Sequence, residues 1–259
     1  MLSGDVTRFD GLAETYDAYR PGYPRAVFEM MAEAAPKSPR CAVDVGAGTG
    51  ISTEGLIEVL GPDWLMVGIE PGMDMRRVLV RRFANSANFQ ASDGRAEAMK
   101  LPDSSAALII ACTAFHWFDR DAFFSEAARV LVPEGVLAII RNRRVEEGVV
   151  PALDAYVAAN LPTVADFKRR EKSKEPSVRE LQAVSGFKQA KSKTFSWSMD
   201  TTARDLVDLY LTRSTTSGVV RQLGLPSVKS ALTDIVEGAH GAGRFSLKWE
   251  TTVKWAKRI

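Results

Sequence analysis

Residues 42–53 read AVDVGAGTGIST, and this short stretch decides the fold. An apolar run ends in an acid and a valine, and glycine follows at every second position from Gly46 to Gly50. The next segment, ISTEGLIEVL, has the apolar spacing of a helix. Because glycine tolerates positive φ and lets a ligand approach the backbone, the stretch predicts a buried strand that turns tightly into a helix beside a ligand.

Strand and helix signals alternate through residues 41–141. Short apolar runs indicate buried strands at CAVDV (41–45), LMVGIE (65–70), ANFQAS (87–92), AALIIAC (106–112) and VLAIIR (136–141). Helical spacing is found at residues 51–60, 73–83 and 119–131, the last segment opening at Asp119. This alternation predicts an α/β fold with a parallel sheet that is covered on both faces.

The pattern changes after Arg143. Residues 145–185 and 200–243 are mostly helical, while 188–200 and 245–258 alternate as strands do. We expect the helical segments to be insertions that pack together as a cap. Residues 1–40 contain the aromatic-rich stretch RFDGLAETYDAYRPGYP, which is a second candidate lid. The expected organisation is a single domain with a core at 41–141.

Composition limits the classes of function. The chain has 259 residues and a net charge of +2, which argues against a strong electrostatic footprint for nucleic acid. Cys41 and Cys112 lie inside apolar runs and predict buried thiols, with neither a disulfide framework nor a metal site. No signal-peptide pattern is visible, and no apolar run approaches the roughly eighteen residues of a membrane span, so a cytoplasmic protein is expected.

The glycine turn departs from the dinucleotide-binding fingerprint. Counting G-x-G-x-x-G from Gly46 and Gly48 places Ile51 at the third glycine position, and Gly50 comes one step early. Asp44 would disfavour a pyrophosphate but tolerates a cationic cofactor. Glu70 ends the second strand, where an acid can accept the hydroxyls of a ribose. An adenosine with a ribose, positive charge and no phosphates fits these residues, as S-adenosylmethionine does.

Longer motifs resemble a known family. The segments VDVGAGTG, GIEPGMDM, GRAEAMKLPDSSAALIIACTAFHWFD and EAARVLVPEGVLAII resemble, in this order, the motifs of class I S-adenosylmethionine-dependent methyltransferases. YDAYRPGYP, HWFD, YLTRSTTS and KWETTVKWAK are similar to segments of the small-molecule enzymes related to trans-aconitate methyltransferase. The resemblance implies a Rossmann-like fold with a mostly parallel seven-stranded sheet and a helical cap.

The resemblance also implies cofactor-binding residues. These are Asp44, Gly46, Ala47, Gly48, Glu70, Pro71, Met73, Arg95, Ala96, Thr113, Tyr16 and Arg20. Arg20 would pair with the cofactor carboxylate. Arg95 is a departure, because many relatives have an aspartate there that accepts from the adenine amino group. Arginine has no acceptor, so Asp93 or the backbone alone would make this contact.

Four residues are candidates for the acceptor side of the site. His116 follows the fourth strand and would act as a base toward a hydroxyl or carboxyl, or would be a structural ring packed on Trp117. Tyr19 and Trp117 would contact the substrate. In the segment RNRR at 141–144, Arg141, Arg143 or Arg144 would bind an acidic substrate, and Arg143 is the residue chosen here. The alternative is that this segment is exposed charge at the entrance to the cap.

The sequence thus predicts S-adenosylmethionine-dependent methyl transfer to a small molecule, with a carboxyl or hydroxyl oxygen as the acceptor. Two alternatives stay open: a methyltransferase acting on RNA or protein, and a binding module without turnover. A nicotinamide oxidoreductase is disfavoured by Ile51 and Asp44. The expected partner is a small-molecule substrate, with no nucleic acid and no membrane, for a monomer or homodimer without a metal.

Overall fold

The computed structural model describes residues 11, 13–160, 175–241 and 243–259. Seven strands form one sheet: β1 (Cys41–Val45), β2 (Leu65–Ile69), β3 (Phe89–Ser92), β4 (Ala106–Cys112), β5 (Leu131–Arg144), β6 (Phe187–Thr201) and β7 (Phe245–Arg258). The core helices are α1 (Ala13–Tyr19), α2 (Arg25–Ala34), α3 (Ile51–Leu60), α4 (Met73–Arg82) and α5 (Arg120–Val130), with a short 3₁₀ turn, η2 (Phe115–Trp117), after β4. The later helices are α6 (Val150–Ala159), α8 (Val178–Ala183), α9 (Ala203–Leu211), α10 (Ser214–Leu223) and α11 (Leu225–His240).

The sheet has the order β3-β2-β1-β4-β5-β7-β6. Strands β1 to β5 pair in parallel, whereas β7 is antiparallel to both β5 and β6. The predicted mostly parallel seven-stranded sheet is therefore confirmed. The strand order reverses between β1 and β4, and a ligand of an open α/β sheet binds at the carboxyl ends of the strands flanking that point.

Helices cover both faces of the sheet, as continuous apolar strands require. Every residue of β4 is buried. One core cluster packs the sheet against α5, and the other packs its opposite face against α2 and α3. Helix α5 begins where expected, because the side chain of Asp119 caps it by accepting from the Ala122 amide at 3.1 Å.

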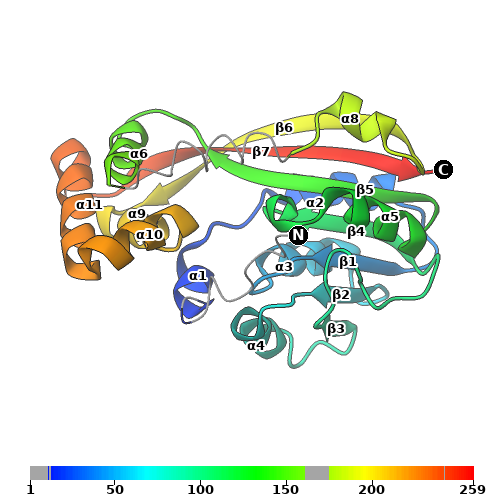
Figure 1. Ribbon diagram of the computed structural model, residues 1–259. Helices are drawn as coiled ribbons and strands as arrows, with labels where there is room; N and C mark the ends of the chain where they lie inside the picture. Colours follow the sequence, from blue (N-terminus) through cyan, green and yellow to red (C-terminus); the bar gives the residue numbers. More distant parts are fainter. Residues whose placement is uncertain (1–10, 12, 161–174, 242) are drawn as a thin grey trace.

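The cap stands on three long strands. β5, β6 and β7 run beyond the shorter strands and carry α6, α9, α10 and α11 at their far end (Figure 1). These helices share a third apolar cluster that includes Trp249 of β7. Helix α1 contacts both α4 of the core and α9 of the cap. The site edge of the sheet is therefore flanked by an N-terminal helix and by a helical cap.

Helix α8 differs from the expectation that residues 145–185 belong to the cap. It contacts β6 and β7 near their core end (Figure 1). Its buried Leu181 joins the same core cluster as Phe124 and Phe187. The physical reason is that the apolar face of α8 completes the layer begun by α5, so that, of the residues of this segment that the structure describes, those of α6 join the cap cluster.

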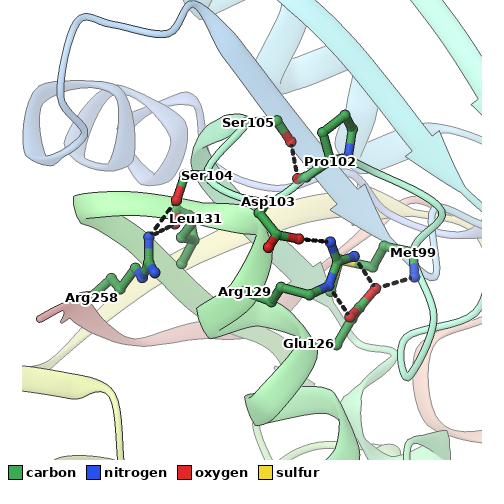
Figure 2. Close-up of polar contacts among 9 residues, drawn as sticks. All are labelled: Met99, Pro102, Asp103, Ser104, Ser105, Glu126, Arg129, Leu131 and Arg258. Carbon is green, nitrogen blue, oxygen red and sulfur yellow. Dashed lines mark hydrogen bonds and ion pairs between the residues drawn. The ribbon is translucent and has the colours of Figure 1, made fainter.

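Arg129 of α5 fixes the opposite end of β4 (Figure 2). Its guanidinium donates to Asp103 at 2.5 Å and to both oxygens of Glu126 at 2.8 Å. Glu126 also accepts from the amide of Met99 at 2.7 Å. Beside this cluster, Arg258 at the end of β7 donates to the backbone at the start of β5. These contacts hold the amino ends of the central strands, far from their carboxyl ends.

Candidate active site

The glycine turn after β1 is tight. Gly46, Gly48 and Gly50 have φ of +72°, +57° and +96°, the left-handed region that favours glycine. A Cβ on Gly46 would lie 2.5 Å from the Cβ of Ala114, whereas a Cβ on Gly48 would meet open space. The amides of Gly46 and Ala47 both donate to the carbonyl of Ile69, which anchors the turn on β2. Gly46 thus serves packing, and Gly48 faces the space available to a ligand.

Asp44 lies fully buried under this turn. Its Oδ2 accepts from the hydroxyls of Ser52 and Thr53, each at 2.7 Å, and so ties β1 to the start of α3. Its Oδ1 has no hydrogen-bond partner among the described residues. Burial raises the pKa of Asp44 to about 6, while the two hydroxyls act in the opposite direction. The carboxylate thus orders the turn and keeps one oxygen unpaired.

Glu70 ends β2 beside the turn. Its Oε2 accepts from the Gly48 amide at 2.9 Å, and its Oε1 accepts from the Gly72 amide at 2.7 Å. Burial raises the pKa of Glu70, and these backbone contacts counter the shift. Arg76 holds the segment by donating to the carbonyls of Glu70 and Pro71. Each carboxylate oxygen retains a further lone pair, as the two hydroxyls of a ribose require.

An open pocket lies at the carboxyl ends of β1, β4 and β5, the place that the strand order indicates. Its lining includes six of the predicted residues: Tyr16, Arg20, Gly46, Ala47, Gly48 and Thr113. The other lining residues are Pro21, Tyr23, Thr49, Ile51, Ser52, Cys112, Asn142 and Trp249.

Tyr23 and Asn142 connect the walls of the pocket. The Tyr23 hydroxyl and the Thr113 hydroxyl lie 2.9 Å apart, and Asn142 donates to the carbonyl of Gly22 at 2.8 Å. The Thr251 hydroxyl donates to Asn142 at 2.6 Å, which brings in β7. Burial raises the pKa of Tyr23 well above its usual range, so its hydroxyl stays neutral. Sequence reasoning missed both residues, although Tyr23 stands in the aromatic lid segment and Asn142 directly follows the fifth predicted strand.

The remaining predicted cofactor residues lie around the pocket without lining it. Asp44 and Glu70 support the turn from β1 and β2. Pro71 follows β2, and Met73 at the start of α4 is 72% exposed. Arg95 is exposed and Ala96 is buried in the core, both within a small loop closed by backbone contacts between residues 95 and 98. Arg20 donates to the Thr212 hydroxyl at 3.0 Å and so contacts the cap.

The residues predicted for the acceptor side do not line the pocket and lie in different parts of the structure. His116 and Trp117 lie half-buried in η2, with ring centroids 4.8 Å apart, outside the pocket lining. Tyr19 packs against the apolar cluster of the cap. Arg143 is exposed and is not brought into the pocket. The neighbouring Arg144 is largely buried instead, because successive strand residues point to opposite faces.

Cys41 and Cys112 are free and buried, as the sequence predicts. Burial raises the pKa of both thiols, which leaves them protonated. The described residues contain no group of three potential metal-ligating side chains. Within the same residues, no helix has the length and apolarity needed to cross a membrane.

Comparisons with known proteins agree with this geometry. Residues 43–139 match a family described as "Methyltransferase domain". An uncharacterized methyltransferase of Mycobacterium tuberculosis is 30% identical over 228 residues, which cover 86% of this chain and 85% of that protein. Trans-aconitate 2-methyltransferase of Rhizobium leguminosarum is 30% identical over 128 residues, about half of each chain.

Solved structures share the fold. A protein of Anaeromyxobacter dehalogenans, provisionally described as a type II methyltransferase, is 22% identical with a TM-score of 0.68, over 92% of this chain and 98% of that one. Phosphoethanolamine N-methyltransferase 2 of Haemonchus contortus is 13% identical with a TM-score of 0.58, over 99% of this chain and 60% of that one. The chain thus has the class I methyltransferase fold.

The chain belongs to the methyltransferase family, and S-adenosylmethionine is its methyl donor. The residues present fit this cofactor. Gly48 leaves room where a side chain would intrude, and Glu70 offers acceptors at the end of β2. The buried Asp44 under the turn disfavours a pyrophosphate at this place.

Proposed function

We propose that this protein transfers a methyl group to a small-molecule acceptor, at a carboxyl or hydroxyl oxygen. The observation that carries the proposal is the composition of the pocket wall. Tyr16 and Arg20 of the N-terminal segment, Asn142 of β5 and Trp249 of the cap-bearing β7 join the glycine turn around one space. A site walled by a lid and a cap suits a small acceptor better than an open basic surface for RNA, and the net charge of +2 agrees.

In this proposal the turn and the end of β2 hold the cofactor. Gly46, Ala47 and Gly48 lie along its methionine and ribose parts, and Glu70 accepts the ribose hydroxyls. Asp44 keeps the turn ordered. When bound, S-adenosylmethionine supplies an electrophilic methyl group on a sulfonium. The rest of the set completes the site: Pro71, Met73, Arg95 and Ala96 flank the adenine, and Tyr16, Arg20 and Thr113 lie toward the methionine end.

The chain's further contribution is orientation and the exclusion of water. A rigid pocket that aligns an acceptor oxygen with the methyl group lowers the entropic part of the barrier. Tyr23, Thr113 and Asn142 form a hydrogen-bonded wall that fixes this geometry. Tyr19 and Trp117 would contribute apolar surface beside the acceptor. The match to trans-aconitate 2-methyltransferase over half of the chain supports an acid as the acceptor.

His116 would hold the proton of a hydroxyl acceptor, which a carboxylate acceptor does not carry. The change His116→Ala should therefore slow transfer to a hydroxyl acceptor more than transfer to a carboxylate. Initial rates with paired acceptors measure this difference. Equal slowing with both would assign His116 to packing against Trp117.

The proposal is tested with S-adenosylmethionine labelled in the transferable methyl group. The protein is incubated with the metabolite fraction of a cell extract and, separately, with its RNA and protein fraction. Label in a low-molecular-weight product is the expected result. Label in acid-precipitable material would move the acceptor to RNA or protein. Binding of the cofactor without any transfer would favour a module that has lost turnover.

The location of the protein in the cell and its oligomeric state are also proposals. We place the protein in the cytoplasm, which agrees with its two unpaired thiols. A monomer or homodimer remains the expected assembly, and the molar mass in solution would decide between them.

A further inference from the structure

Two buried N–H donors stand beside the pocket without an acceptor. Nε of Arg144 and Nε1 of Trp249 have no hydrogen-bond partner among the described residues. The two residues face each other in the antiparallel pairing of β5 with β7. The guanidinium carbon of Arg144 lies 5.8 Å from the ring centroid of Trp249. Buried donors are almost always paired, so two adjacent unpaired ones indicate an acceptor that comes from a ligand.

Positive charge gathers around these donors. The Oδ1 atom of Asp154 accepts from Arg213 at 2.6 Å and from the Tyr210 hydroxyl at 3.2 Å. Arg144 lies 4.0 Å from the same oxygen. Both guanidinium groups lie over the Tyr210 ring, at 4.5 Å for Arg144 and 4.8 Å for Arg213. Asp154 is therefore shared by two cations: Arg213 engages it directly, whereas Arg144 pairs with the same oxygen at the longer distance of 4.0 Å.

The Arg144 guanidinium is held in place and charged. Its side chain is only 12% exposed, and burial lowers its pKa to about 10. At neutral pH it therefore carries a full charge in a largely water-free position, where an isolated cation is costly. Nearby positive charge on Arg213 and Arg20 adds to this cost.

These donors are continuous with the pocket. Trp249 and Arg20 line it directly. Asn142, a further lining residue, precedes Arg144 by two positions on β5, so both side chains point to the same face of the sheet. Arg144 does not itself line the pocket. It lies with the indole N–H of Trp249 directly behind the cap side of the lining, while the other side of the pocket is formed by the glycine turn.

We propose that the methyl acceptor carries an anionic oxygen group, a carboxylate or a phosphate, which binds between Arg144 and Trp249 at the cap end of the pocket. The inference rests on the proposed function, because it assigns the acceptor end of that same site. Arg144 supplies charge and Nε–H, and Trp249 supplies Nε1–H. Of the three arginines that the sequence offered for an acidic substrate, the proposal thus assigns Arg144 in place of the chosen Arg143.

Binding of simple anions tests the proposal without any need for turnover. Succinate and inorganic phosphate are titrated into the protein saturated with S-adenosylhomocysteine, and succinamide serves as the neutral counterpart. The unmodified protein should bind at least one of the anions at least tenfold more tightly than succinamide. The better anion tells whether the group is a carboxylate or a phosphate. Equal binding of the amide, or no binding of either anion, overturns the proposal.

Three variants locate the subsite. Arg144→Met should weaken binding of the preferred anion at least tenfold, and Trp249→Phe, which keeps a ring but loses the N–H, should weaken it several-fold. Arg204→Met is the matched control, because this α9 arginine has an 80% exposed side chain and should leave anion binding unchanged. Anion binding that persists in both Arg144→Met and Trp249→Phe would show that Arg144 only packs against aromatic rings. If Arg144→Met does not fold, Trp249→Phe and the anion preference of the unmodified protein decide.

Binding of S-adenosylhomocysteine is recorded separately for every variant. It should be unchanged, because Arg144 and Trp249 lie on the acceptor side. A protein that binds the anions but not S-adenosylhomocysteine would contradict the proposed function and leave the anion site standing. A protein that binds S-adenosylhomocysteine but not the anions would support the cofactor site and overturn the proposed anion site.

Discussion

Asp44 shows how a single buried carboxylate serves the turn at a cost in stability. The two hydroxyl donors of Ser52 and Thr53 compensate only part of its burial, since Oδ1 remains unpaired among the described residues and the pKa rises to about 6. An acid whose pKa is raised by folding binds a proton more tightly in the folded state than in the unfolded chain. Its ionisation therefore lowers stability as the pH rises from about 4 through 6.

The change Asp44→Asn removes this titration. When the pH falls from 7 to 5, protonation of Asp44 should raise the free energy of unfolding of the wild type by about 1 kcal/mol. The variant lacks this gain, so the difference in stability between the two proteins should change by that amount. Urea unfolding of both proteins at the two pH values measures the difference. A constant difference between them would show that Asp44 has an ordinary pKa in the folded state.

Two glycines of the same turn should respond differently to alanine. Gly46→Ala places a Cβ against Ala114 at a positive φ, and should destabilise the fold by about 2 kcal/mol or more. Gly48→Ala meets only open space and should cost about 1 kcal/mol through backbone strain. Its larger effect should be on binding of S-adenosylhomocysteine, which needs that space. Thermal unfolding and calorimetry of both variants separate the two effects, and equal unfolding temperatures would refute this division of roles.

At the scale of elements, one arginine fastens the N-terminal helix to the core. Arg82 of α4 donates to Asp17 of α1 at 2.5 Å, to Glu54 of α3 at 2.6 Å and to the carbonyl of Thr49 at 3.1 Å. Its side chain is only 20% exposed. Because α1 ends beside Arg20, which contacts the cap, this cluster positions one wall of the pocket.

Arg82→Met should loosen α1. Its amides should exchange with solvent faster, and S-adenosylhomocysteine should bind several-fold more weakly, because Tyr16 and Arg20 line the pocket. Arg81→Met is the control. The pair of Arg81 with Glu14 also joins α4 to α1, but both side chains are more than half exposed and such pairs contribute little. Hydrogen exchange followed by mass spectrometry measures both variants, and equal protection in them would contradict the anchoring role of Arg82.

Local elements could be predicted because each has a clear pattern. AALIIAC forms β4 and FSLKWETTVKWAKR forms β7 with the expected bounds. Both strands are indicated by the pattern of residues adjacent in the sequence. This pattern is continuous apolarity in β4 and alternation of apolar and polar residues in β7. The position of α8 could not be predicted, because its short apolar face fits either the cap or the core and only the assembled sheet decides.

The candidate site could be predicted on one side only. The cofactor half depends on a strand, a turn and a helix that are adjacent in the sequence, so the glycine turn and Glu70 stand out. The acceptor half depends on the pairing of β5 with β7, which sets Arg144 opposite Trp249 across a long separation in sequence. For that reason the basic segment at 141–144 could indicate an acidic substrate, but the sequence could not show which of its arginines lies opposite Trp249. The residue chosen from it, Arg143, is exposed.

At the scale of the whole molecule, the three long strands join the two halves of the site. β5 passes from the buried core to the cap, so that Asn142 lines the pocket together with the glycine turn and Arg144 contacts Asp154 of α6 and Tyr210 of α9. The cap is therefore built on the continuation of the sheet, and in the proposed function these strands set the spacing between the glycine turn and the acceptor end of the pocket. This arrangement agrees with the class I fold shared with the structure from Anaeromyxobacter dehalogenans.

The central claim is that the turn after β1 and the end of β2 hold S-adenosylmethionine. Calorimetric titration with S-adenosylhomocysteine tests it most directly, with NADH as the competing ligand and Glu70→Ala as the variant. We expect S-adenosylhomocysteine to bind and NADH not to bind. Glu70→Ala should weaken binding at least about tenfold, or 1.4 kcal/mol, because it removes the acceptors for the ribose. Unchanged affinity in Glu70→Ala, or binding of NADH in place of S-adenosylhomocysteine, would contradict the account.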